Sequence, residues 1–217
     1  MLKLALRDSL SIGLACVPMG VAFGVLVSHS GLAWWWATVF ATVIFAGSLE
    51  FLVLGLVTAG APLAQIGLAA FLVNVRHVFY ALSFPLHRVD GRLAKAYSTF
   101  ALTDEAYALA VRPAAQAWGK TRILWLQAFI QLYWVSSVTL GAMAGSLVPD
   151  GIVGLDFAVT ALFLVLGIDA LRARRDLPTP LVAIACALAA RFSAGERMLV
   201  VAMGLFTTYL LIRYVRA

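Results

Sequence analysis

The stretch AAFLVNVRHVFYALSF, residues 69–84, is largely aliphatic and aromatic, but it carries Asn74, Arg76 and His77 at its centre. On a helix that turns 100° per residue, these polar residues and Tyr80 share one broad face. The opposite face carries only apolar side chains, those of Phe71, Val75, Val78, Phe79 and Leu82. The stretch therefore predicts a membrane helix with a lipid-facing stripe and a polar surface turned toward protein.

The composition extends this interpretation to the whole chain. Of the 217 residues 63% are hydrophobic and 12% are charged, whereas soluble domains average about 45–50% apolar and about 25% charged residues. The apolar runs are continuous and lack the period-two alternation of a transmembrane barrel. We therefore predict an all-α, polytopic transmembrane helix bundle that forms a single integral membrane domain, residues 1–217. The net charge of +6 is assigned to membrane orientation and not to nucleic-acid binding.

A membrane-spanning helix needs about 20 mostly apolar residues. Two candidate segments are weak, because 96–112 contains Thr-Asp-Glu at its centre and 178–190 has a short apolar run. Either segment could be a half-helix or a re-entrant element. Eight segments is the prediction, and seven with one re-entrant segment is the alternative. The eight candidates are residues 9–28, 33–58, 62–86, 96–112, 121–147, 156–172, 178–190 and 196–214.

The basic residues predict the orientation of the chain. With eight spans and a cytoplasmic N-terminus beside Lys3 and Arg7, most basic loops fall on the cytoplasmic side, as the positive-inside rule requires. The loop with Arg88, Arg92 and Lys95 would lie on the other side and break that rule.

Two similar octapeptides, GVAFGVLV and GAMAGSLV, lie 121 residues apart, and each contains G-x-x-x-G. This motif lets two helix backbones approach closely. The predicted helix-packing residues are Gly20, Gly24, Gly141 and Gly145. The similarity also suggests repeat halves, residues 1–118 and 119–217, with broken helices. Four segments per half would make the halves parallel, and three would make them inverted.

The segment FAGSLEF, residues 45–51, interrupts an apolar run with Gly47 and Ser48 and continues to Glu50. Glycine costs about 1 kcal/mol in a helix interior. A kink here would free backbone N–H and C=O groups to meet a ligand, and Glu50 would bind an ammonium group or carry a proton. The alternative is that Gly47 only allows packing, while Glu50 lies near the interface or pairs with an arginine.

Arg76 lies about ten residues from the nearest loop, too deep for easy snorkelling. We expect it to be buried against an acidic partner, for which LTDEAYAL, residues 102–109, offers Asp104 and Glu105. The alternative is that Thr103 caps a helix whose first turn holds these two acids. For the opening stretch, the alternative is a snorkelling arginine with a hydrogen-bonded core His77.

Several functions are disfavoured by missing motifs. The chain contains no G-x-S-x-G, C-x-x-C, H-E-x-x-H or Walker loop, so neither an enzyme nor a redox protein is expected. Three scattered histidines and two cysteines in apolar segments predict no metal site, and no cofactor is expected.

In order along the chain, the segments PMGVAFG, FAGSLEF, VNVRHVFYALS, LTDEAYAL and GLDFAVTALF resemble the AzlC family. This family comprises the large subunits of bacterial branched-chain amino acid exporters. The resemblance covers about residues 7–175 and implies an inner-membrane exporter of small neutral amino acids. It also implies a small membrane partner of the AzlD type. The chain departs from the family at Glu50, where the resemblance leads us to expect glutamine.

The predicted function is a secondary transporter of small, branched-chain amino acids, with proton coupling through Glu50. Arg76 and the turn at Gly47 would hold the substrate carboxylate, and Glu50 or Asp104 its amino group, with Phe51 and Phe79 around its aliphatic tail. The remaining predicted site residues are Ser48, Asn74, His77, Tyr80, Thr103 and Glu105. The alternative is a channel or a structural subunit of a membrane complex.

Overall fold

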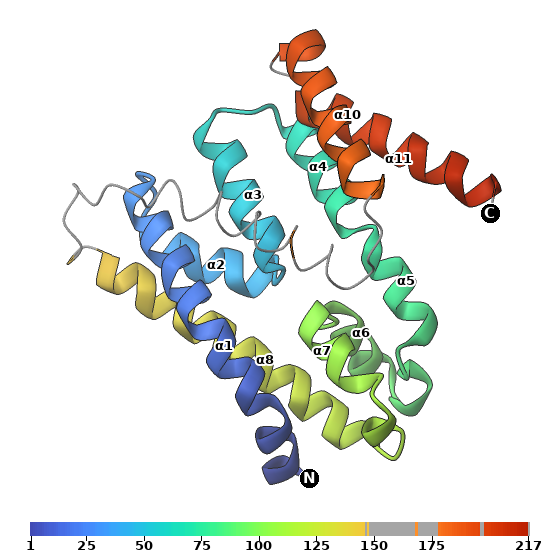
Figure 1. Ribbon diagram of the computed structural model, residues 1–217. Helices are drawn as coiled ribbons and strands as arrows, with labels where there is room; N and C mark the ends of the chain where they lie inside the picture. Colours follow the sequence, from blue (N-terminus) through green and yellow to red (C-terminus); the bar gives the residue numbers. More distant parts are fainter. Residues whose placement is uncertain (146, 148–167, 169–177, 196–197, 217) are drawn as a thin grey trace. The chain divides into compact units, whose positions relative to one another are not determined.

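The computed structural model describes residues 1–145, 147, 168, 178–195 and 198–216, and the predicted segment 156–172 lies almost entirely outside them. All regular elements in this part of the chain are helices (Figure 1). Three helical stretches in it are long and apolar enough to cross a membrane: Leu2–His29, Leu63–Tyr80 and Lys120–Gly145. The prediction of an all-α membrane protein is therefore confirmed.

The described residues form two compact units, and each is described by itself. The first comprises residues 1–58 together with those described in 74–155, and the second comprises 59–73 together with those described in 156–217. The second unit contains α10 (Pro178–Ala194) and α11 (Met198–Arg216), which pack on each other. Its segment 178–190, predicted to be short, continues as helix to Ala194.

The first unit is built on α1 (Leu2–His29) and α8 (Lys120–Gly145), which lie side by side (Figure 1). The two G-x-x-x-G motifs lie at this contact. A Cβ atom added to Gly24 would collide with the Val138 carbonyl oxygen, and one added to Gly141 with the Val21 carbonyl oxygen. Only glycine lets the two backbones approach this closely.

α1 and α8 run parallel to each other. Near their starts Asp8 pairs with Arg122, and near their ends Gly145 lies against Ser28. We call the side of the pair at Asp8 and Arg122 the amino end, and the side at Ser28 and Gly145 the carboxyl end. Parallel packing is what parallel repeat halves require, although residues 148–167 and 169–177 of the second half lie outside the described residues.

The predicted span 33–58 is two short helices, α2 (Trp35–Val43) and α3 (Gly47–Thr58), with the predicted break between them. α2 contacts α8 through a hydrogen bond between the hydroxyl groups of Thr38 and Thr139, 2.8 Å. The Phe23 ring of α1 contacts Phe40 before the break and Phe51 after it.

The chain therefore enters along α2 from the carboxyl end and turns back along α3 (Figure 1). The two helices form a hairpin whose tip is the break at residues 44–46.

The predicted segment 96–112 is also divided, into α6 (Arg92–Phe100) and α7 (Asp104–Ala110). Short 3-10 turns, Leu86–Arg88 and Pro113–Ala115, flank this pair. Arg88 Nη1 donates to the Ala115 carbonyl at 3.0 Å. The chain therefore enters and leaves the α6–α7 pair at the same place, the amino end.

This arrangement corrects the predicted position of one loop. The loop with Arg88, Arg92 and Lys95 was expected on the opposite side of the membrane from residues 112–122, but Arg88 is hydrogen-bonded to the segment after α7. The reason is length, because α6 and α7 have nine and seven residues and cover about 14 and 10 Å. Neither crosses a hydrocarbon layer of about 30 Å.

The predicted span 62–86 contains α4 (Leu63–Asn74) and α5 (Arg76–Ser83), separated at Val75. The five members of the predicted lipid-facing stripe are each at least 40% exposed, as a lipid-facing surface requires. One consequence is a correction, because Phe79 is 64% exposed on this stripe and does not line a protein-enclosed substrate site.

Candidate functional site at two helix breaks

Glu50 lies in the first turn of α3 and is fully buried. Its Oε1 accepts a hydrogen bond from the Ala46 N–H at 3.1 Å. The Trp134 indole Nε1 donates to both carboxyl oxygens, at 2.9 and 3.1 Å. Because the first N–H groups of a helix have no partner within it, the carboxyl group supplies an acceptor that hydrocarbon lacks. Among the described side chains its partner is therefore Trp134 of α8 and not the arginine of the alternative interpretation.

The backbone before Glu50 is unusual. Phe45 has φ 46°, the left-handed region, which costs energy for a residue with a side chain. A Cβ atom on Gly47 would lie 3.2 Å from the Trp134 ring, so glycine makes room for that ring, as the packing alternative proposed. Ser48 follows in the first turn of α3 and is half-buried.

The second break, between α6 and α7, is held by two polar side chains. Thr103 caps α7, because its Oγ1 accepts from the Ala106 N–H at 3.3 Å. Asp104 and Glu105 occupy the first turn and are half-buried, which favours a helix start electrostatically. The structure therefore confirms the alternative prediction that Thr103 caps a helix whose first turn holds Asp104 and Glu105.

Gln127 of α8 holds the other side of this break. It is fully buried, and its Nε2 donates to the carbonyls of Ser98, 2.8 Å, and Ala101, 3.1 Å. The last carbonyls of a helix lack partners within it, so Gln127 stabilises the end of α6. Within the described part of the chain, its Oε1 and the Ser98 Oγ are buried without a hydrogen-bond partner.

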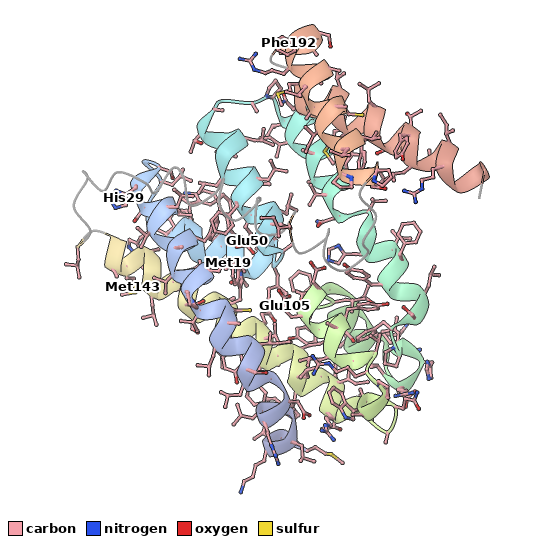
Figure 2. The ribbon with its side chains drawn as sticks, viewed as in Figure 1. Met19, His29, Glu50, Glu105, Met143 and Phe192 are labelled. Atoms are coloured by element: carbon pink, nitrogen blue, oxygen red, sulfur yellow. The ribbon has the colours of Figure 1, made fainter. Side chains whose placement is uncertain are left out.

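The two breaks lie next to each other. The rings of Phe45, at the α2–α3 break, and Phe100, at the end of α6, are 6.0 Å apart and inclined by 36°. Figure 2 labels Glu50 on α3, Met19 on α1 and Glu105 on α7 in the middle of the first unit. Six of the ten residues predicted for substrate binding or coupling lie at the starts of α3 and α7: Gly47, Ser48, Glu50, Thr103, Asp104 and Glu105.

The polar face of α5 lies against α7. Tyr80 stacks on Tyr107 with centroids 4.4 Å apart, and the hydroxyl groups of Tyr107 and Ser83 are 2.7 Å apart. His77 bonds locally, with Nδ1 3.1 Å from the Asn74 carbonyl oxygen. Asn74 Oδ1 is buried and has no hydrogen-bond partner among the described residues.

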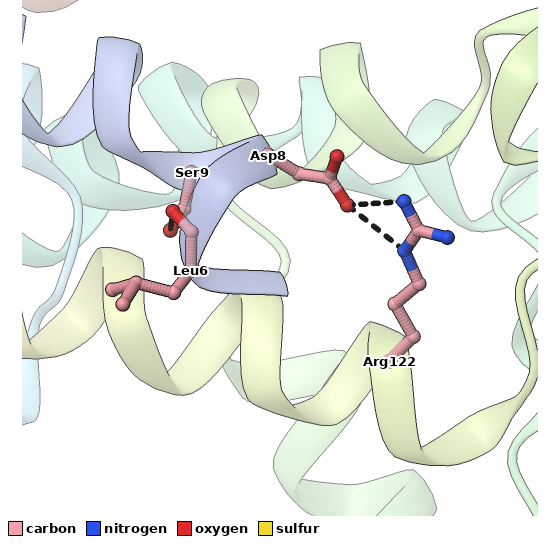
Figure 3. Close-up of polar contacts among 4 residues, drawn as sticks. All are labelled: Leu6, Asp8, Ser9 and Arg122. Atoms are coloured by element: carbon pink, nitrogen blue, oxygen red, sulfur yellow. Dashed lines mark hydrogen bonds and ion pairs between the residues drawn. The ribbon is translucent and has the colours of Figure 1, made fainter. Parts of the chain in front are cut away.

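The predicted acidic partner of Arg76 stays a prediction, because that side chain lies outside the part that the structure describes. A different arginine forms an ion pair at the amino end, where Arg122 donates to Asp8 Oδ2 from Nε at 2.8 Å and from Nη2 at 2.6 Å (Figure 3). The same guanidinium lies 4.5 Å from the centroid of the Trp118 ring. These contacts join α1 to α8 and are remote in sequence from both breaks.

The sequence interpretation missed Trp134 and Gln127. Both lie in the interior of a long apolar helix, far from the loops that explain most polar residues. A tryptophan at a span's centre needs a partner for its N–H, and an intramembrane amide needs partners for its donors and acceptor. Those two signals would have identified α8 as the helix that holds both breaks.

Comparisons with known proteins agree with the resemblance to the AzlC family. The family described as AzlC protein matches residues 11–148. The "Branched-chain amino acid transport protein AzlC" of Bacillus subtilis is 32% identical over 157 residues, which cover 70% of this chain and 60% of that protein.

Two further relatives are named as membrane proteins. A Helicobacter pylori membrane protein is 31% identical over 166 residues, covering 76% of this chain and 73% of its own. The Escherichia coli "Inner membrane protein YgaZ" is 29% identical over 168 residues, covering 73% and 68%. No solved structure matches. The family match spans α1 to α8 and takes in both hairpins, Glu50 and Trp134, and this chain belongs to the AzlC family.

Proposed function

We propose that this chain is a secondary carrier that exports small neutral amino acids, branched-chain ones among them, across the bacterial cytoplasmic membrane. The name of the Bacillus relative supports the substrate class, and the name of the Escherichia relative supports the location. The observation that carries the proposal is the meeting of two broken helices beside the buried Glu50. Broken helices at mid-membrane are a recurrent way to build a transporter's substrate site.

The substrate would bind at the starts of α3 and α7. An amino acid zwitterion needs partners of both signs. The carboxyl groups of Glu50, Asp104 and Glu105 suit its ammonium group. Backbone N–H groups at the start of α3, with Arg76, suit its carboxylate. The ring of Phe51 would lie against an aliphatic tail, with no chemical change to the substrate.

Coupling to protons is assigned to Glu50. A carboxylate has two acceptor oxygens, whereas the protonated group turns one of them into a donor. The hydrogen bonds from Trp134 and Ala46 therefore depend on the charge of Glu50. Gain or loss of a proton would change how firmly α3 is held to α8.

The N-terminus is assigned to the cytoplasm. The amino end of α1 and α8 collects several basic residues, and such clusters mark the cytoplasmic side. They are Lys3, Arg7, Arg88, Arg92, Lys120 and Arg122. A small membrane subunit of the AzlD type is expected to work with this chain.

Flux into proteoliposomes tests the proposal. We expect saturable counterflow of labelled valine and leucine by the purified chain, alone or with its small subunit. The Glu50→Gln variant should fold but lose the pH dependence of transport. Asp90→Asn, in an exposed loop, is the matched control and should leave the folding and the pH dependence unchanged.

Two results would contradict the proposal. An ion current that does not saturate would indicate a channel. Unchanged pH dependence in Glu50→Gln would exclude the coupling role while leaving carrier function intact.

A further inference from the structure

We propose that α2–α3 and α6–α7 are re-entrant hairpins that enter the bilayer from opposite faces, and that Phe45 and Phe100 form the barrier where their tips meet. The topology stands on its own, and the barrier rests on the proposed carrier function. With this topology the described residues of the first unit form two full helices, α1 and α8, two half-depth hairpins and the short helix α5.

The bases of the hairpins lie at opposite ends of α1 and α8. The α6–α7 pair begins and ends at the amino end, where Arg88 bonds the Ala115 carbonyl. The α2–α3 pair begins just after the carboxyl end of α1, and its contacts with Phe23 bring it back in that direction. Since α1 and α8 are long enough to cross the membrane, these two ends face opposite sides of it.

The lengths of the inward arms match half of a bilayer. α2 and α6 have nine residues each, or about 14 Å at 1.5 Å per residue. Two such arms from opposite faces add up to about 28 Å, close to a hydrocarbon thickness of about 30 Å. The tips also contact the middle of α8, through Gln127 at one break and Trp134 at the other. The Phe45–Phe100 contact therefore lies near the midplane.

The backbone at both tips meets the condition for non-helical chain at this depth. Such backbone is tolerated only when it is buried in protein and its polar groups have partners. Phe45, Ala101, Leu102 and Thr103 are each no more than 8% exposed, and Ile44 and Ala46 are half-buried. The Ala46 N–H bonds Glu50, and the Ala101 carbonyl bonds Gln127.

The two rings are suited to a movable barrier. An apolar ring pair excludes a zwitterion, because charge is costly where water is absent. Phe45 is 4% exposed, whereas Phe100 is 45% exposed, so the first ring is enclosed by protein and the second is partly uncovered. The left-handed backbone of Phe45 stores strain that a moving tip would release.

Cysteine labelling tests the topology without any transport assay. In a chain with Cys16 and Cys186 replaced by serine, single cysteines at Ala33 and Thr58 should react with a membrane-impermeant maleimide from one face. Cysteines at Asp90 and Ala114 should react from the other face. If the cysteines at positions 33 and 58 react from opposite faces, the α2–α3 hairpin is wrong. If the cysteines at positions 90 and 114 react from opposite faces, the α6–α7 hairpin is wrong.

A reversible cross-link tests the barrier. In the same background, Phe45→Cys with Phe100→Cys should form a disulfide on oxidation, abolish valine counterflow, and recover counterflow on reduction. Each single variant should be indifferent to the oxidant. Counterflow that continues through the cross-linked form, or absence of the cross-link, would overturn the barrier. If the serine background shows no amino acid counterflow at all, the proposed function fails, while the labelling pattern still decides the topology.

Discussion

Removing the Trp134 indole N–H should weaken the attachment of α3 to α8. Trp134→Phe keeps an aromatic ring beside Gly47 but removes the donor that bonds both Glu50 oxygens, at 2.9 and 3.1 Å. Glu50 is fully buried, so no water replaces that donor. Hydrogen bonds to charged groups contribute about 1.5–3 kcal/mol, and we expect a loss of unfolding free energy of about that size.

A double-mutant cycle separates this bond from the smaller volume of phenylalanine. Unfolding free energies of Trp134→Phe, Glu50→Ala and the double variant would be measured in mixed detergent micelles. The two changes should couple by at least about 1 kcal/mol, because both remove the same bond. Trp125→Phe is the matched control on α8, since Trp125 is 44% exposed, and its effect should stay within about 0.5 kcal/mol.

Additivity within about 0.3 kcal/mol would refute the reasoning. It would mean that the indole and the carboxyl group stabilise the protein independently. An equal loss in Trp125→Phe would refute it in another way, because the effect would then come from ring size anywhere on α8.

Three further predictions concern the same unit. Gly24→Ala should lower the free energy of unfolding by about 1–3 kcal/mol, because its Cβ atom would collide with backbone atoms of α8. Gly55→Ala is the control in the same unfolding assay. Its Cβ atom would meet open space, so this variant should be neutral or stabilising. Gln127→Leu should cost about 1–3 kcal/mol for each carbonyl that loses its donor, and a loss below about 0.5 kcal/mol would show that α6 ends without its help. Arg122→Gln should change the free energy of unfolding by no more than about 1 kcal/mol, since the Arg122 and Asp8 side chains are 21% and 23% exposed. A larger loss would mean that this ion pair contributes strongly to the packing of α1 on α8.

The long helices and the exposed apolar stripe were predictable because the apolar and polar positions of a membrane helix indicate directly which of its faces is suited to lipid. Phe71, Val78 and Leu82 were assigned to lipid from the helical wheel alone, and all three are exposed. The break at Gly47 was also predictable, since Ala-Gly-Ser interrupts an apolar run and glycine weakens a helix. The residues at both breaks were predicted from polar groups that segment ends do not explain.

The direction of the chain after each break was not predictable in the same way. Residues 33–58 have the length and hydrophobicity of one membrane span, and nothing local distinguishes a kinked span from a hairpin. The difference lies in long-range contacts, such as Phe23 touching both Phe40 and Phe51 and Arg88 reaching Ala115. One sequence feature did indicate the error. The loop with Arg88, Arg92 and Lys95 broke the positive-inside rule, and such a violation suggests that the number of membrane spans before the loop is wrong.

The contacts of Glu50 also decide how cleanly its titration can be tested. Its Oε1 alone accepts both the Ala46 and the Trp134 hydrogen bonds, at 3.1 and 2.9 Å, and the Trp134 contact to Oε2 is the longer of the two. The amide oxygen of a glutamine in this place can therefore accept both bonds, which explains how the residue expected from the AzlC resemblance fits the same break. Glu50→Gln consequently removes the titratable group while keeping the acceptor that holds α3, so a change in pH dependence in this variant reports on the proton and not on the fold.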